Sequence, residues 1–242
     1  MGLVRSIVAP RRYLSSSCNI KAAVMAEALR EFSSCDIGDA LVKLKIPFGG
    51  YLDGISMWSP TRQGVGESPP TVVGPAVTVK LVDVDDTTAP KPDVHFADAN
   101  EPGKVMFIQQ PPHMYSACFG GLMATRAKYI GAAGVVVDGR FRDVREIQEM
   151  KLPLFAKQTS ILGSNGFSRV SEINVPLRFK DDLWINPGDL LVGDHDGVVV
   201  VAPYLVDQVI ELCRARKEID EKTMAALNAG AEMGPTLKKL RK

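Results

Sequence analysis

The sequence predicts an α/β domain built around a central βαβ unit. From Lys104 onward, short apolar runs alternate with segments of helical periodicity, which is typical of parallel strands joined by helices. The 242 residues suffice for one large or two small domains, and a chain of this size buries about 70% of its unfolded surface. We assign residues 20–230 to a single domain and residues 231–242 to a basic C-terminal tail.

The N-terminal part of this domain is predicted to contain two helices. Apolar residues recur at helical spacing over residues 22–32, and the two serines that follow favour a helix end. Asp36 is expected to cap the second helix, because its carboxylate can accept hydrogen bonds from the free N–H groups of a first turn. Pro47 is expected to end that helix, and residues 48–70, rich in Gly, Pro and Ser, are predicted to form a loop.

The central part supplies the βαβ pattern. Residues 72–84 alternate and are β-branched, as a strand requires, and the acidic residues 83–98 are predicted to form a surface loop. Beyond them the pattern predicts three strands and two helices. The strands cover residues 105–109, 135–138 and 154–156, and the helices cover residues 121–130 and 144–150.

A hairpin and a long helix are predicted in the C-terminal third. The apolar runs 190–192 and 198–201 flank the sequence Asp194-His195-Asp196-Gly197, and Asp-Gly between two such runs favours a tight turn. A helix over residues 205–227 follows. His195 is therefore interpreted as an ordinary turn residue.

Composition narrows the partners and cofactors. The formal charge is +1, from 29 basic and 28 acidic residues that are interspersed, so no large field attracts nucleic acid or a membrane surface. No apolar run reaches the ~18 residues of a membrane helix. The four cysteines form no CxxC pair and the three histidines are not clustered. Any metal is therefore expected to be a hard cation bound through oxygen.

The first seventeen residues have the composition of a mitochondrial presequence. They contain three arginines and four serines but no acid. The alternative interpretation is a disordered basic tail. The expected location is mitochondrial in the first case and cytoplasmic in the second.

One edge of the predicted sheet gathers groups that suit an anion and a cation. A helix of ten residues and the strand that returns from it have similar lengths, so the N-terminus of helix 121–130 and the loop 139–143 should meet. Gly120 and Gly121 allow close approach of a ligand to the first N–H groups of the helix, through Leu122 and Met123. We expect a carboxylate to bind there.

Three charged residues complete the candidate site. Arg142 offers a guanidinium to an anion, Asp143 offers a carboxylate to a cation such as Mg²⁺, and Glu146 is one helical turn further on. Such a set suits a reaction that passes through an enolate. A solvated helix start with an internal ion pair would show the same pattern, so both interpretations stay open at this point.

The run GGLMATRAKYIGAAGVVVDGRFRDVRE resembles the signature of the 4-hydroxy-4-methyl-2-oxoglutarate aldolase family, also called RraA-like after a bacterial regulator of ribonuclease E. In that signature, Gly is followed after twenty residues by Arg-Asp, and after two more by Asp or Glu, as in Gly121, Arg142, Asp143 and Glu146. The segments SSCDIGDAL, GPAVTV and PGDLLVGDHDGVVVV also resemble the family, and IPFGGYL resembles its eukaryotic type. The resemblance covers about residues 30–210.

The resemblance implies a swivelling α/β/β domain like that of phosphohistidine domains, assembled as a homotrimer with sites between subunits. It implies Mg²⁺ or Mn²⁺ on Asp143, a water oriented by Glu146, an enolate stabilised by Arg142, and a pyruvyl carboxylate on the N–H groups of Leu122 and Met123. Acids of a neighbouring subunit often line such sites, and Asp36 and Asp39 are the nearest candidates.

The implied function is that of a metal-dependent carbon–carbon lyase on 2-oxo acids. It includes aldol cleavage of 4-hydroxy-4-methyl-2-oxoglutarate to two pyruvates and decarboxylation of oxaloacetate. Many such aldolases carry an acid at the position of Gly121. The resemblance therefore supports the general class of lyase more strongly than the specific aldolase activity. The alternative function is that of a non-catalytic regulator that binds a ribonuclease or helicase.

Two further residues could lie near the site. His113 could approach the Gly120 edge from the preceding loop, whereas Cys118 is not expected to be a nucleophile, because no His lies near it in the sequence.

Overall fold

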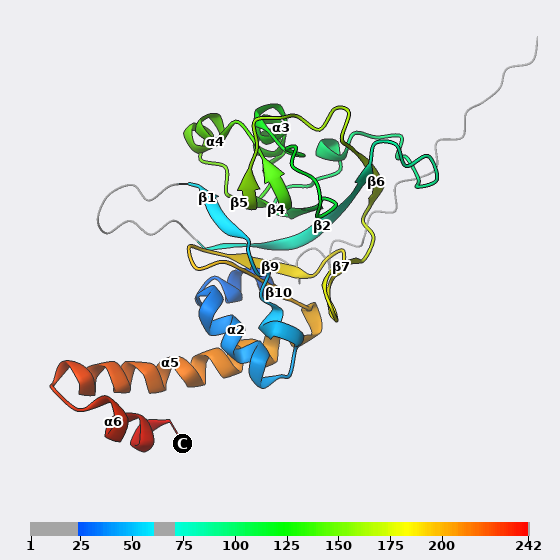
Figure 1. The fold of residues 1–242 in the computed structure, drawn as a ribbon. Helices are drawn as coiled ribbons and strands as arrows, with labels where there is room; N and C mark the ends of the chain where they lie inside the picture. The colour runs from blue at the N-terminus through cyan, green and yellow to red at the C-terminus, as the bar shows by residue number, and fades with distance from the viewer. Residues whose placement is uncertain (1–23, 61–70, 242) are drawn as a thin grey trace, which may run out of the picture.

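The computed structural model describes residues 24–60 and 71–241, which form a layered α/β fold (Figure 1). The expected presequence, residues 1–17, lies outside the described residues. Within the described ranges, no helix has both the length and the hydropathy needed to cross a membrane. The strands are β1 (Ser56–Ser59), β2 (Val72–Asp83), β3 (Val105–Gln109), β4 (Gly134–Phe141), β5 (Leu154–Thr159), β6 (Ser168–Ile173), β7 (Leu177–Lys180), β8 (Leu183–Ile185), β9 (Leu190–Gly193) and β10 (Val198–Val201).

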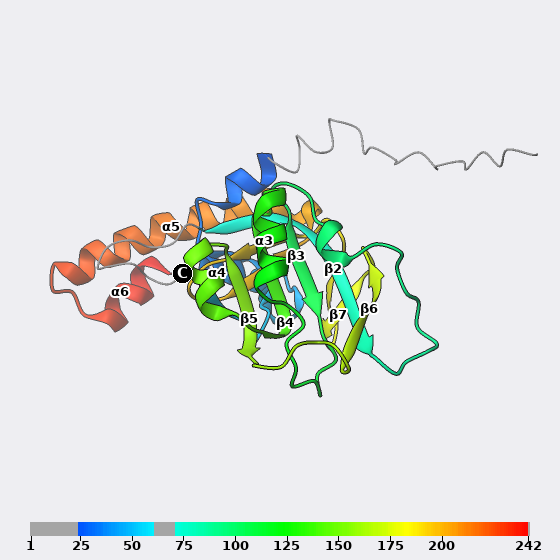
Figure 2. The ribbon, with the colours of Figure 1, turned by 90° about the horizontal axis from the view of Figure 1, so that it is seen from above.

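The helices lie on two sides of these strands. Helices α3 and α4 cover one face, whereas β9 and β10 lie behind the other face, with α2 and α5 beyond them (Figure 1). Seen from above, α3 and α4 lie over the parallel strands (Figure 2). The helices are α2 (Ser34–Lys43), α3 (Gly121–Ile130), α4 (Val144–Met150), α5 (Val206–Asn228) and α6 (Met233–Leu240), and short 3₁₀ turns cover Pro47–Gly50, Phe96–Asp98 and Pro203–Leu205.

Strand β2 joins two layers of sheet. Its first residues, Val72 to Pro75, pair antiparallel with β9, and residues from Ala76 to Lys80 pair parallel with β3. The strand order is β1-β5-β4-β3-β2-β9-β10, with β6 also on β2, while β7 and β8 form a separate hairpin. The parallel pairs β2–β3, β3–β4 and β4–β5 place the carboxyl ends of four strands at one edge.

Three apolar clusters hold the layers together. One lies between α3, α4 and the parallel strands and includes Phe141 and Ile147. A second lies between the two sheet layers and includes Phe107 and Phe155, and a third packs β9 and β10 against α2 and α5. Because alternate residues of β3, β4 and β5 enter the first two clusters, these strands are apolar on both faces, as buried parallel strands are.

Most predicted elements are confirmed. Strand β3 and helices α3 and α4 have the predicted bounds, and the 190–201 hairpin forms. Helix α5 is shifted by one residue at each end, and β2 ends one residue earlier than predicted. Helical backbone over residues 24–29 agrees with the first predicted helix. The acidic segment 83–98 is largely irregular, apart from one 3₁₀ turn at its end.

Several predictions at the N-terminal side were wrong. The N-cap of α2 is Ser33, and Asp36 instead accepts a hydrogen bond from the Ser33 backbone N–H at 3.0 Å as the other half of a capping box. The helix ends at Lys43 rather than at Pro47, because Lys45 takes a left-handed φ of 59°. The predicted loop 48–70 contains strand β1, which pairs with β5.

Other elements are longer than predicted or were not predicted. Strand β4 continues past a bulge, so that Arg140 and Phe141 pair with Gln158 and Thr159 of a longer β5. The predicted loop 139–143 therefore shortens to Arg142 and Asp143. The basic tail contains α6, and β6, β7 and β8 had no predicted counterpart.

Candidate functional site

The predicted meeting of two chain segments at one sheet edge is confirmed. The backbone N–H of Gly121, at the start of α3, donates to Asp143 Oδ2 at 2.8 Å. The carbonyl of Phe119 accepts from the Arg142 N–H at 3.0 Å, and Phe119 also forms a parallel bridge to Phe141. The segment that enters α3 therefore runs beside the end of β4, which fixes the helix start next to the Arg-Asp pair.

Asp143 adopts a backbone conformation that only a few residue types take readily. Its φ and ψ are 64° and 40°, in the left-handed region, which costs a non-glycine residue about 1 kcal/mol or more. Asp143 precedes α4 but its side chain makes no capping bond to that helix. The carboxylate turns instead to the N-terminus of α3, where the helix dipole favours a negative charge.

The carboxylate of Glu146 lies beside that of Asp143. A Cβ placed on Gly121 would stand 2.1 Å from Glu146 Oε2 and 3.4 Å from Asp143 Oδ2, so both oxygens lie close to one point. A Cβ on Gly120 would stand 2.7 Å from Asp143 Oδ2. A side chain at either position would therefore have to displace one of the two acids, and an acid at position 121 would have to displace Glu146.

Arg142 lies at the rim of the same edge. Its Nε is 3.6 Å from Asp143 Oδ2, and its side chain is 46% exposed, so the ion pair is weak and leaves the guanidinium accessible. The loop after β5 passes close to it: a Cβ on Gly163 would stand 3.1 Å from Arg142 Nη1. Arg142 and Asp143 line a cavity of about 570 Å³ together with Thr159, Ser160 and Ile161.

The first turn of α3 offers N–H groups at this edge. Its N-cap, Gly120, has no side chain to satisfy them and the first turn contains no acid. Asp143 takes the N–H of Gly121, whereas Leu122 and Met123 follow in the same turn, and the Leu122 side chain is almost fully exposed. The structure therefore brings together the first turn of α3, Arg142, Asp143 and Glu146.

Two predicted acids lie elsewhere in the chain. Asp36 and Asp39 belong to α2, which packs below β10 and against α5, on the far side of the sheets from α3 (Figure 1). Asp36 is engaged in the capping box, and Asp39 lies 3.9 Å from Arg216. Within one chain they do not reach the Arg142 edge, and their role from a neighbouring subunit stays a prediction.

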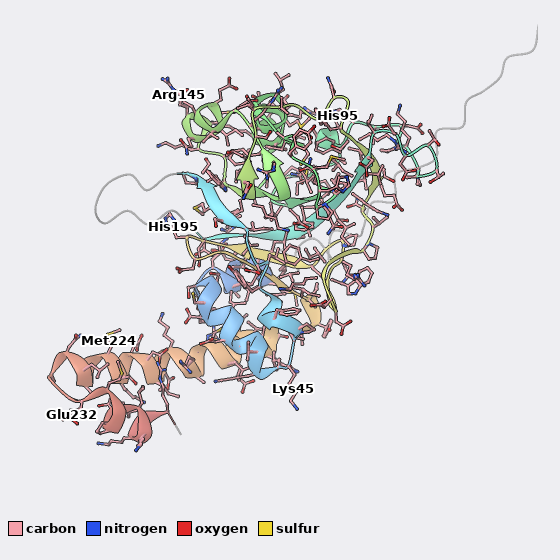
Figure 3. The ribbon with its side chains drawn as sticks, in the orientation of Figure 1. Lys45, His95, Arg145, His195, Met224 and Glu232 are labelled. Atoms are coloured by element: carbon pink, nitrogen blue, oxygen red, sulfur yellow. The ribbon has the colours of Figure 1, made fainter. Side chains whose placement is uncertain are left out.

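The histidines and Cys118 take ordinary roles. His113 pairs with Asp83 at 2.9 Å, at the end of β2, rather than with the start of α3. His195 lies in the β9–β10 turn, well away from Arg145 on α4 (Figure 3). Burial raises the pKa of the Cys118 thiol to about 12, so this cysteine is unsuited to nucleophilic attack at neutral pH.

Sequence reasoning missed two features of the region. Thr159 and the loop residues Ser160 and Ile161 line the Arg142 cavity, where β5 extends three residues beyond its predicted end. A larger cavity, of about 650 Å³, lies at the same carboxyl ends of the strands but does not include Arg142 or Asp143. Its residues come from positions 54 to 181, a spread that no local sequence pattern reveals.

An α/β layer backed by a second β layer defines the chain as an α/β/β swivelling-domain protein. The sequence matches the RraA-like family, described as Aldolase/RraA, over residues 34–200. The chain therefore belongs to this family, as its glycine–arginine–aspartate signature had suggested.

Individual relatives agree with this assignment. A protein of Halalkalibacterium halodurans named putative 4-hydroxy-4-methyl-2-oxoglutarate aldolase is 32% identical over 177 residues, which is 73% of this chain and 81% of the relative. An uncharacterized protein of Pseudomonas syringae pv. tomato superposes with a TM-score of 0.74 at 25% identity, covering 89% of this chain and 97% of that one. RraAS2 of Streptomyces coelicolor, described as an unusual member of the RNase ES inhibitor RraA family, shares the fold with a TM-score of 0.69 at 24% identity, over 89% of this chain and 99% of that one.

Proposed function

We propose that this protein is a divalent-metal-dependent carbon–carbon lyase that acts on 2-oxo acids through a pyruvate enolate. Its reactions would be the cleavage of 4-hydroxy-4-methyl-2-oxoglutarate to two pyruvates and the decarboxylation of oxaloacetate. The observation that carries the proposal is the 2.8 Å contact between the Gly121 N–H and Asp143, which joins a helix N-terminus to the Arg-Asp pair. Relatives named as aldolases support the same class of reaction.

The two acids fit a hard cation. Asp143 and Glu146 place oxygens near one point, and Mg²⁺ is commonly bound by one or two carboxylates, with water and substrate in the other positions. Within the described ranges, no group of three or more His, Cys, Asp or Glu side chains is placed to hold a metal ion. Asp143 would hold Mg²⁺ or Mn²⁺, and the cation would supply Lewis acidity toward the 2-keto and carboxylate oxygens.

The remaining groups position the substrate. The N–H groups of Leu122 and Met123 lie at the positive end of α3 and would bind the substrate carboxylate. Arg142 would stabilise the negative charge that develops on the keto oxygen when the C3–C4 bond breaks. In the aldol reaction the C4 hydroxyl loses its proton and C4 becomes the keto carbon of the second pyruvate. Glu146, whose carboxylate lies beside that of Asp143, would accept that proton directly or through a water.

The decisive experiment measures pyruvate release from both substrates with and without EDTA. We expect EDTA to abolish release and added Mg²⁺ or Mn²⁺ to restore it. Asp143→Ala should remove activity, whereas Asp98→Ala, which changes an exposed acid paired with Arg126, should retain it. Activity that survives chelation, or that is unchanged in Asp143→Ala, would refute the metal mechanism. If the protein releases pyruvate from neither substrate, the alternative of a regulator that binds other proteins is favoured.

A further inference from the structure

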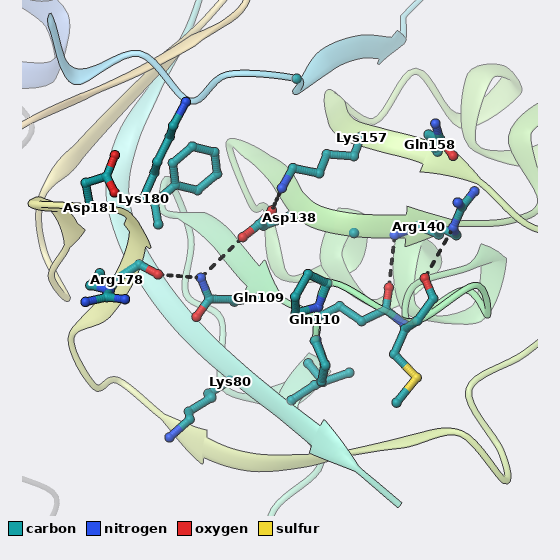
Figure 4. Close-up of a pocket in the computed structure, with 17 residues that line it drawn as sticks. Lys80, Gln109, Gln110, Asp138, Arg140, Lys157, Gln158, Arg178, Lys180 and Asp181 are labelled. Carbon is teal, nitrogen blue, oxygen red and sulfur yellow. Dashed lines mark hydrogen bonds and ion pairs between the residues drawn. The ribbon is translucent and has the colours of Figure 1, made fainter. Parts of the chain in front are cut away.

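One cavity of the described residues lies at the carboxyl ends of the parallel strands (Figure 4), on the face opposite α3 and α4. Gln109 and Lys157 follow Phe107 and Phe155 by two residues, and Asp138 follows Val136 likewise, so all three face the layer of β9 and β10. The volume of about 650 Å³ is in the range of small-molecule sites.

The cavity carries a surplus of positive charge. Five basic side chains and two carboxylates, Asp138 and Asp181, line it. Two of the lysines also pair with acids outside the lining, Lys80 with Glu172 at 2.8 Å and Lys180 with Asp53 at 3.8 Å, which leaves a formal surplus of one positive charge. The basic residues are Lys80, Arg140, Lys157, Arg178 and Lys180. The open surface of this cavity therefore favours an anion over a neutral or cationic ligand.

Both guanidinium groups lack a carboxylate partner within the described ranges. Arg140 donates to the carbonyls of Thr159, at 3.1 Å, and Met114, at 3.4 Å. Within the described residues Arg178 forms no ion pair, and its backbone carbonyl, but not its side chain, accepts a hydrogen bond from Gln109. A guanidinium presents a planar fork of donors that matches carboxylate and phosphate groups.

The floor of the cavity is held by polar contacts. The Gln109 amide donates to Asp138 at 3.2 Å and to the Arg178 carbonyl at 2.9 Å, which ties the β7–β8 hairpin to the sheet. The ammonium of Lys157 lies 2.5 Å from Asp138 and 5.2 Å from the centre of the Phe179 ring. Figure 4 shows Asp138 between Lys157 and Gln109, with Arg178 and Lys180 to one side. Fixed donors and acceptors of this kind reduce the cost of ordering a ligand site.

We propose that this cavity binds a small organic anion with at least two acidic groups, at a site separate from Arg142 and Asp143. Acidic groups would bind to the basic side chains, and a hydroxyl of the ligand would meet Asp138, whose carboxylate accepts hydrogen bonds only. Carboxylate and phosphate groups share this chemistry. The site does not depend on the proposed lyase activity.

Isothermal titration of the full chain in metal-free buffer tests the proposal, with citrate and pyrophosphate as polyanions and acetate as a monoanion. We expect saturable binding of citrate or pyrophosphate at one site per chain, and acetate should bind at least about tenfold more weakly. Stronger binding of citrate would identify a polycarboxylate site, and stronger binding of pyrophosphate would identify a phosphate site.

Three variants locate the binding. Arg178→Met should weaken it by about tenfold or more, while Arg145→Met, at an exposed residue of α4 paired with Glu149 and remote from the cavity, removes one positive charge as a matched control (Figure 3). Thermal unfolding confirms that each variant is folded. The proposal is overturned if neither polyanion saturates, if Arg145→Met weakens binding as much as Arg178→Met, or if Arg142→Met abolishes binding while Arg178→Met leaves it intact.

Discussion

The carboxylate of Asp143 accepts a hydrogen bond from the backbone N–H of Gly121, at 2.8 Å and across 22 residues of chain. The contact satisfies one N–H donor at the N-terminus of α3. It also turns the Asp143 side chain away from α4, the helix that Asp143 precedes, while the Asp143 backbone is in the left-handed region. Asp143 thus has an unfavourable backbone conformation at the position where the proposed chemistry requires a carboxylate.

The charge of Asp143 should matter more than its shape. Asparagine tolerates the left-handed region and can still accept from the Gly121 N–H. We expect Asp143→Asn to lower kcat/KM for pyruvate release by at least about 100-fold and to change the free energy of unfolding by less than about 1 kcal/mol. Steady-state kinetics and urea unfolding measure the two effects. Retained activity in this variant would show that the carboxylate is not needed.

Gly121 should be coupled to Glu146. A Cβ at position 121 would approach Glu146 Oε2 to 2.1 Å, so Gly121→Ala should destabilise the fold by about 1 kcal/mol. The same change in a Glu146→Ala background should be neutral or stabilising, since the clash is gone. Gly234→Ala, in α6 where a Cβ meets nothing within 4 Å, is the matched control and should not destabilise. Additive effects in the double-mutant cycle would contradict the contact.

The buried thiols should resist alkylation and weaken the fold at high pH. Burial raises the pKa of Cys118 to about 12, from an ordinary value of 9.0. Between these values the unfolded chain releases a proton that the folded chain keeps, so the free energy of unfolding falls as pH rises from 9 toward 12. Cys118→Ala should flatten this pH dependence in urea titrations. Rapid modification of Cys118 by iodoacetamide at pH 8, identified by mass spectrometry, would be inconsistent with its burial.

The neighbouring-subunit acid can be tested by complementation. If the protein is a homotrimer with Asp143 from one subunit and Asp39 from the next at each site, Asp143→Ala and Asp39→Ala should both be weakly active. Refolding them together in equal amounts should restore about a quarter of wild-type pyruvate release, because one random interface in four combines both intact acids. No recovery in trimers verified by ultracentrifugation would exclude Asp39, and a monomer would exclude the arrangement altogether.

The central unit could be predicted from sequence because its signals are local. The apolar run at 135–138 and the helical period at 121–130 are each set by nearby residues, and the similar lengths of the helix and of the strand that returns from it place Gly121 near Asp143. The bulge that carries β4 on to Phe141 depends on pairing with a distant β5, so it left no such signal. Asp36 was misplaced because Ser33, three residues earlier, is the N-cap and Asp36 is the other half of the same local capping box.

The basic cavity illustrates a second limit. Lys157 and Arg178 look like ordinary surface residues of short, half-exposed strands, and their meeting depends on how the β7–β8 hairpin folds back over the sheet. The signature around Arg142 was readable because its members lie within 26 residues of chain. A site assembled from many elements has no comparable signature.

The double pairing of β2 makes the two sheet layers a single mechanical unit. Since one uninterrupted strand pairs with β9 through its first residues, Val72 to Pro75, and with β3 through Ala76 to Lys80, the layers cannot separate unless that strand loses one of its ladders. Amide protons of β2 should therefore exchange with solvent only through global opening. The edge that holds Asp143 and the long helix α5, though on opposite sides of the molecule, should share one unfolding transition.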